Sequence, residues 1–220
     1  LLTGGKGAIF LSTDALGQAP FIVATRIDGK QKEAGIRQAI SISENEIRQI
    51  FGDQIKPEKQ CDWSRRDGRV LARSKETFGA VVLSDQVWKD VDNETIAHAL
   101  LNGIREIGLC LNTSAQFFLA RLAVAGAPYD EITQSYLIDT LEAWLLPHIS
   151  GLKTVEDWKS CNKLPALQSL LDWTDSQRLD EIAPAVFTTP LGRKILINYG
   201  SDYPHISLKL QEMFGLKSHP

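Results

Sequence analysis

The 220-residue sequence lacks any long apolar segment. Its longest uncharged stretch, from Ile107 to Ala120, is too short to span a bilayer and contains the polar residues Asn112 and Gln116. No leader with a basic, then apolar, then small-residue pattern is visible. These features predict a cytoplasmic protein with no membrane partner.

Cysteine and methionine are also scarce. Cys61, Cys110 and Cys161 are odd in number and far apart, which is not the pattern of a disulfide framework. We expect three reduced thiols, as is usual in the cytoplasm. Met213 is the single methionine and the chain begins with two leucines, so we expect a piece of a longer protein.

Motifs that would carry catalysis are missing. The glycine-rich segment 4–7 lacks both the preceding strand and the Lys-Ser/Thr ending of a phosphate-binding loop. There is no Gly-x-Ser-x-Gly nucleophile motif. No two of the histidines have metal-ligand spacing; they are His98, His148, His205 and His219. We therefore expect no catalytic residue, metal or cofactor in this chain, and neither binding nor hydrolysis of ATP by it alone.

The composition is that of an ordinary globular protein. Hydrophobic residues make up 43% and charged residues 23%, which argues against disorder and coiled coil. Residues 1–90 carry 14 Lys and Arg against 12 Asp and Glu, whereas residues 91–220 carry 10 against 15. Neither part has the net charge of a strongly basic nucleic-acid-binding domain, so local clusters matter more.

Residues 1–90 are expected to be rich in β-structure. Short apolar or alternating runs separated by Gly, Pro and Asp predict several strands, and Ser43 with Glu46 forms a capping box for a short helix. Many short strands in so few residues favour a small OB-like β-barrel over 1–90. The predicted strands are 8–11, 21–24, 36–42, 60–63, 69–74 and 80–83.

The apolar period becomes helical near residue 91, which predicts a domain boundary there. Residues 91–220 are expected to be a mainly helical region with a mixed tail, giving an α+β protein overall. In the tail, a hairpin is expected across 190–193. The predicted helices are 92–107, 113–125, 130–146, 155–161, 164–171 and 206–214.

One cluster of residues suggests binding. A turn at Asp67-Gly68 carries several cations, and guanidinium groups suit phosphate recognition and base stacking. The alternative, a solvated hairpin partly neutralised by Asp62 and Asp67, remains open. The candidate nucleic-acid-binding residues are Trp63, Arg65, Arg66, Arg69, Arg73 and Lys75.

An ordered set of segments resembles the C-terminal region of bacterial HrpB-type ATP-dependent RNA helicases, of the DEAH/RHA class. No single segment is specific, but their order spans essentially the whole chain, with a departure at Pro190-Leu191-Gly192. The segments are Lys6-Gly7-Ala8, Ile27-Asp28-Gly29, Gly35-Ile36-Arg37, Asp62-Trp63, Val70-Leu71-Ala72-Arg73, 79–84, 141–147, 179–184 and 210–216.

This resemblance implies a motor that the chain does not contain. The ATPase domains, which use ATP and magnesium, would lie upstream of Leu1 in the same parent protein. The present chain would supply the OB barrel and the family-specific helical region, which help to close the channel for single-stranded RNA. Its partners would be that RNA and the motor domains.

Two other functions remain open from the residues alone. The acidic helical half would serve as a docking face if the chain is a protein-interaction module. A free-standing enzyme would need a pocket of converging titratable groups, and the sequence offers no such constellation.

Overall fold

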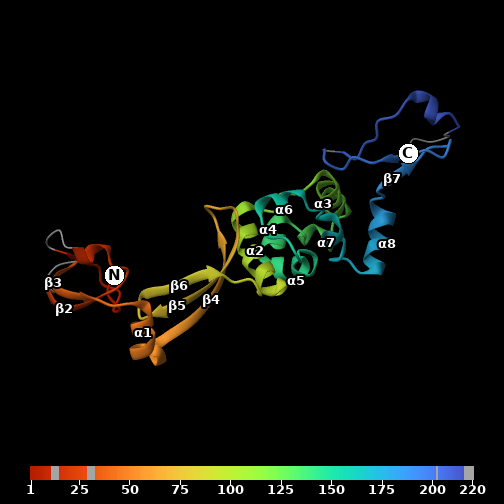
Figure 1. Ribbon diagram of the computed structural model, residues 1–220. Helices are drawn as coiled ribbons and strands as arrows, with labels where there is room; N and C mark the ends of the chain where they lie inside the picture. The colour runs from red at the N-terminus through yellow and green to blue at the C-terminus, as the bar shows by residue number, and fades with distance from the viewer. Residues whose placement is uncertain (11–14, 29–32, 202, 216–220) are drawn as a thin grey trace. The chain divides into compact units, whose positions relative to one another are not determined.

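The structure, a computed structural model, describes all residues except 11–14, 29–32, 202 and 216–220 (Figure 1). The chain divides into two compact units. Residues 1–61 and 71–91 form the first unit, and residues 62–70 and 92–220 form the second. Strands β4 (Ile55–Ser64) and β5 (Arg69–Phe78) pair with each other, and the segment that joins them belongs to the second unit.

The first unit contains two three-stranded sheets. In one, β3 (Ala34–Ser41) lies between β1 (Ala8–Phe10), which runs parallel to it, and β2 (Ile22–Asp28), which runs antiparallel. In the other, β5 lies between β4 and β6 (Val81–Val87), with β6 antiparallel to β5. Each sheet therefore has a central strand and two edges.

The α+β class predicted from the sequence is confirmed, but the closed OB-like barrel is not. In the described part of the chain the strands form two separate sheets, and no closed barrel is present. The strands predicted from the alternation of apolar residues lie near the observed strands. The alternation does not encode which strands pair, because pairing depends on contacts between distant parts of the chain.

Helix α1 (Glu44–Phe51) confirms the capping box. Ser43 Oγ accepts a hydrogen bond from the Glu46 amide at 3.3 Å, and the Glu46 carboxylate accepts one from the Ser43 amide at 2.8 Å. The helix is held to β5 by a stacked Phe51–Phe78 pair with ring centroids 4.9 Å apart. Its position therefore depends on both local capping and sheet packing.

The second unit is built around a helical core (Figure 1). Asp92 caps α2 and Asn112 caps α3, as short polar side chains at helix starts do. A continuous buried apolar cluster fills the space between the helices. The helices are α2 (Asn93–Ile107), α3 (Thr113–Ala125), α4 (Gln134–Asp139), α5 (Leu141–Leu145), α6 (Val155–Ser160), α7 (Leu164–Gln168) and α8 (Trp173–Ile182).

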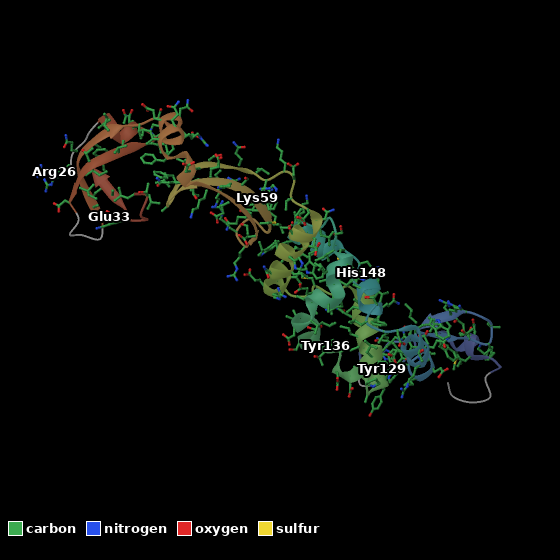
Figure 2. The ribbon with its side chains drawn as sticks, turned by 90° about the horizontal axis from the view of Figure 1, so that it is seen from below. Arg26, Glu33, Lys59, Tyr129, Tyr136 and His148 are labelled. Atoms are coloured by element: carbon green, nitrogen blue, oxygen red, sulfur yellow. The ribbon has the colours of Figure 1, made fainter. Side chains whose placement is uncertain are left out.

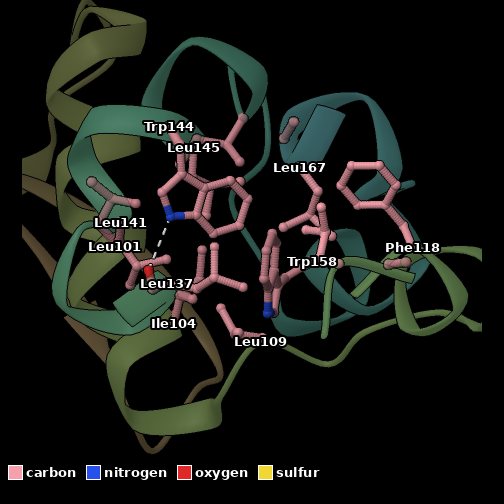
Figure 3. Packing of buried hydrophobic residues seen from close by; sticks show 14 of the residues in the cluster. Leu101, Ile104, Leu109, Phe118, Leu137, Leu141, Trp144, Leu145, Trp158 and Leu167 are labelled. Atoms are coloured by element: carbon pink, nitrogen blue, oxygen red, sulfur yellow. Dashed lines mark hydrogen bonds between the residues drawn. The ribbon is translucent and has the colours of Figure 1, made fainter. Parts of the chain in front are cut away.

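Two tryptophans are central to this core (Figure 3). Trp144 is 3% exposed, and its indole N–H donates a 2.9 Å hydrogen bond to the Leu137 carbonyl. Trp158 is fully buried, and its N–H donates to the Gly108 carbonyl at 3.0 Å. Both rings are thus packed and have their polar atom paired, which is what a buried indole requires.

Two helix predictions were wrong in extent, and one helix was missed. The single helix expected over 130–146 is α4 and α5 with a break at Thr140, whose Oγ1 donates to the Tyr136 carbonyl. Local side-chain-to-backbone bonds of this kind compete with helix continuation. The helix expected over 206–214 is a short 3-10 turn, Leu210–Met213, and α8 was not predicted.

The tail forms the expected hairpin. Strand β7 (Val186–Thr188) pairs antiparallel with β8 (Lys194–Leu196) across the segment 189–193. Among the residues that the structure describes, no helix has both the length and the apolar character to cross a bilayer.

Candidate nucleic-acid interface

The segment that joins β4 to β5, residues 62–70, is called the hairpin tip here. Its turn is closed by the Gly68 amide, which donates to the Ser64 carbonyl at 2.8 Å. Gly68 has a φ of +60°, a conformation that favours glycine. The Ser64 hydroxyl donates to the Asp67 carboxylate at 2.7 Å and holds the pKa of that carboxyl below its usual value. The turn predicted at Asp67-Gly68 is therefore present.

Backbone hydrogen bonds fix the hairpin tip to the segment before α6. The Val155 amide donates to the Gly68 carbonyl at 2.9 Å, and the Val70 amide donates to the Lys153 carbonyl at 2.8 Å. A bridge between Arg69 and Thr154 lies between these two bonds. The backbone of the tip is thus held at several points, so its side chains start from a defined position.

Trp63 attaches the other side of the hairpin tip to α2. A Cβ atom placed on Gly103 would lie 2.3 Å from Trp63 Cδ2, 2.6 Å from Cε2 and 2.7 Å from Cε3. Near-equal distances to neighbouring atoms of the six-membered ring mean that the ring face covers the helix backbone. Trp63 also packs against the buried cluster of the second unit, so it contributes to the core as well as to the tip.

We expect Gly103→Ala to destabilise the chain even though alanine favours helices. The gain in helix propensity is about 1 kcal/mol, whereas a methyl group that overlaps a packed ring costs about 1–3 kcal/mol and displaces the ring. Urea unfolding should show a net loss of stability together with a change in tryptophan fluorescence. Asn102→Ala, at an exposed neighbouring position, is the control. Higher stability in Gly103→Ala would contradict the described packing.

The arginines of the hairpin tip are Arg65, Arg66 and Arg69, and all three are exposed. The side chain of Arg65 is 81% exposed and pairs with Glu106 at 3.0 Å, which raises the pKa of the guanidinium. The Arg66 side chain is 93% exposed and lies 3.4 Å from Asp67. Exposed ion pairs contribute little to stability, so these guanidinium groups can exchange their partners for phosphate oxygens at small cost.

Arg73 and Lys75 belong to the first unit and are half-buried. Arg73 donates to Asp85 on β6 at 2.9 Å, and Lys75 donates to the Gln60 side chain on β4 at 3.1 Å. Figure 2 labels Lys59 of β4. Its ammonium lies 4.8 Å from the centre of the ring of Trp88, which follows β6. Arg73 and Lys75 of β5 therefore have partners on the neighbouring strands. Of the tip arginines, Arg65 pairs with α2 and Arg66 pairs within the tip itself.

Sequence reasoning missed Glu106, Ile107 and Val155, which lie beside the hairpin tip. Together with Trp63, Arg65 and Gly68 they line a cavity of about 300 Å³. No local signal in the sequence identifies them, because they come from α2 and the start of α6. Glu106 in particular has the pattern of an ordinary solvated position near a helix end.

The glycine-rich segment and the acidic side chains were compared with what a nucleotide or a metal ion requires. The glycine-rich segment 4–7 forms a turn in which the Gly5 amide donates to the Leu2 carbonyl at 2.9 Å, so this amide is not directed at a phosphate. Within the described residues there is no group of three or more His, Cys, Asp or Glu side chains placed to hold a metal ion.

Comparison with known proteins shows which proteins the chain is similar to. Residues 144–220 match the family described as "ATP-dependent helicase C-terminal". The whole chain aligns, with 31% identity over 230 residues, to the ATP-dependent RNA helicase HrpB of Escherichia coli (strain K12). The resemblance to the C-terminal region of HrpB-type helicases that the sequence suggested is confirmed.

Solved structures agree with this similarity. A crystal structure of the E. coli DExH-box NTPase HrpB matches all of the chain with a TM-score of 0.55 and 31% identity. A crystal structure of the Escherichia coli DEAH/RHA helicase HrpB matches 99% of it with a TM-score of 0.56 and 28% identity. The chain spans only 28% of the length of the curated relative and 28% and 29% of the two crystallised chains.

Proposed function

We propose that this chain is the auxiliary C-terminal part of an ATP-dependent RNA helicase. In this proposal its hairpin tip helps to form the channel for single-stranded RNA and contacts the sugar-phosphate backbone. Support comes from the similarity to HrpB over the whole chain. ATP and magnesium act in motor domains that the parent protein carries elsewhere, and those domains are partners of this chain.

The observation that carries the RNA contact is the exposure of Arg65, Arg66 and Arg69 on a backbone held by hydrogen bonds. Guanidinium groups bind phosphate oxygens through two parallel hydrogen bonds, and a fixed turn reduces the entropy lost on binding. Contacts to phosphate position a strand without reading its sequence. We therefore propose weak binding with little sequence preference through these three residues.

Arg73, Lys75 and Trp63 have secondary roles in the proposal. Arg73 and Lys75 would give up a hydrogen-bonded partner on a neighbouring strand in order to bind phosphate. Trp63 offers a ring for stacking, but its face is partly used against Gly103. We also propose that the functional division of the chain lies near residue 90, with a family-specific role for the helical remainder.

The experiment is a titration of single-stranded RNA at several salt concentrations. The triple variant Arg65→Ala, Arg66→Ala, Arg69→Ala should bind about tenfold more weakly at low salt. Each lost phosphate contact should flatten the slope of log affinity against log salt by about 0.7, so the triple change should remove about 2 units. Electrophoretic mobility or fluorescence anisotropy provides the measurement.

A matched control removes three exposed cations elsewhere, by Arg26→Ala, Lys56→Ala and Lys89→Ala. It changes the net charge by the same amount and should leave the slope close to that of the unmodified chain. If both triple variants change binding equally, the effect is one of general charge, and the proposed contact at the tip is wrong.

A protein-docking function is the second candidate, favoured by α8. This helix exposes Trp173 to 75% and Ile182 to 49%, and it carries Asp175, Asp180 and Glu181. Exposed large apolar groups among acidic residues are typical of surfaces that bind another protein. Two results would favour this candidate. The unmodified chain would show no affinity for RNA, and the arginine triple variant would still bind the protein partner.

A further inference from the structure

The cavity beside the hairpin tip, called the tip pocket here, has the chemistry of a site for a flat heterocycle. Its volume is about 300 Å³. This is at the lower end of the range of about 300–1,000 Å³ for ligand pockets, which suits a single ring system rather than a large ligand. The lining residues are Trp63, Arg65, Gly68, Glu106, Ile107 and Val155.

The walls of the tip pocket are largely apolar. Ile107 and Val155 contribute aliphatic groups, and Trp63 contributes the part of its indole that Gly103 does not cover. Gly68 has no side chain to fill the space, and a Cβ there would lie 3.3 Å from Val155 Cγ2. Stacking and apolar contact with such walls stabilise an inserted base whatever its identity.

Two charged groups complete the tip pocket. Arg65 and Glu106 form an exposed pair at 3.0 Å, with side chains 81% and 41% exposed. A carboxylate accepts hydrogen bonds only, so Glu106 suits the amino groups of a base edge. Arg65 donates only, so it suits the phosphate that accompanies such a base.

We propose that the tip pocket accepts one unstacked base of single-stranded RNA, with Glu106 accepting a hydrogen bond from an exocyclic amino group. This inference rests on the proposed function, since the tip arginines bring the strand to the pocket. The proposed function involves contacts to phosphate only, and this inference adds a contact to a base. Adenine, cytosine and guanine carry the amino group, and uracil does not.

The test compares short single-stranded oligoribonucleotides of equal length and charge, some of them abasic, with the full chain. Stacking of one base should make the base-containing strands bind about tenfold more tightly than the abasic strand. Val155→Phe fills the pocket and should reduce this ratio toward one, while the salt slope set by the tip arginines stays unchanged. Thermal melting checks that the variant folds.

Glu106→Gln is the second variant and changes an exposed side chain without changing its shape. The unmodified chain should bind adenine, cytosine or guanine strands a few times more tightly than uracil strands. Glu106→Gln should reduce this difference, because the glutamine amide accepts from amino groups more weakly than a carboxylate and also donates to the carbonyls of uracil. Its ratio of base-containing to abasic affinity should remain. This variant tests the hydrogen bond even if Val155→Phe fails to fold.

The outcomes separate the two proposals. Equal binding of abasic and base-containing RNA, with a salt slope that depends on the tip arginines, would overturn the pocket and leave the backbone contact intact. A base preference that survives Val155→Phe in a folded protein would also overturn the pocket. Absence of any RNA binding would overturn the proposed function itself.

Discussion

Trp144→Ala should lower the free energy of unfolding by about 3–5 kcal/mol, the usual cost of removing a large aromatic side chain from a core. Trp144 is 3% exposed and lies among Leu137, Leu141 and Leu145 (Figure 3). The change removes this packing and leaves the Leu137 carbonyl without the 2.9 Å hydrogen bond from the indole. Urea unfolding followed by far-ultraviolet circular dichroism measures the loss.

Trp173→Ala is the matched control, because it removes the same side chain from a position that is 75% exposed. Substitutions on the surface usually change stability by less than about 0.5 kcal/mol. A loss below about 1 kcal/mol for Trp144→Ala, or equal losses for the two variants, would contradict the described core.

Lys163→Met should lower the free energy of unfolding by about 1.5–3 kcal/mol, the range for hydrogen bonds that involve a charged group. Lys163 is 1% exposed, and its ammonium donates to the carbonyls of Trp158 and Lys159 near the C-terminal end of α6. The same group lies 4.6 Å from the centre of the Trp158 ring. Carbonyl dipoles and the ring face together stabilise the buried positive charge.

Methionine has a similar length but cannot donate a hydrogen bond, so Lys163→Met separates the role of the ammonium from that of the aliphatic chain. Lys159→Met removes an exposed lysine from the same helix and should leave stability nearly unchanged. Near-ultraviolet circular dichroism should also change in Lys163→Met, since Trp158 loses a neighbour. Unchanged stability in this variant would mean that the buried ammonium is not required.

Elements with strong local signals were predictable from the sequence. The capping box at Ser43 and Glu46 is present, and α2 and α3 begin and end close to their predicted bounds. Caps and terminal glycines act within a few residues, so a reading of the sequence detects them. The buried stripe around Trp144 was also predicted, although the helix that carries it breaks at Thr140.

Non-local features were not predictable. Strand alternation cannot tell a closed barrel from two sheets, since both bury every second residue. Nothing in the sequence shows that position 103 must be glycine. The close approach of Trp63 in the fold excludes a side chain there. A start for α8 could have been found from Asp172, whose carboxylate accepts from the Asp175 amide.

In the candidate site too, the locally encoded residues were predictable and those that only the fold brings together were not. The arginines of the hairpin tip were identified because they are clustered in the sequence around a turn. Glu106 and Val155 were not, because only the fold brings α2 and the start of α6 to that turn. Arg73 and Lys75 were included on strand periodicity, but their contacts with Asp85 and Gln60 depend on the neighbouring strands.

Photocrosslinking of single-stranded RNA to the chain, with the modified residues mapped by mass spectrometry, tests the central claim most directly. Thiouridine-substituted RNA reacts with the side chains that it touches, so the position of contact is read without a substitution. We expect adducts concentrated between Trp63 and Arg69, and these should disappear as salt is raised. Adducts confined to other segments, such as β7–β8 or α8, with none at the hairpin tip, would contradict it.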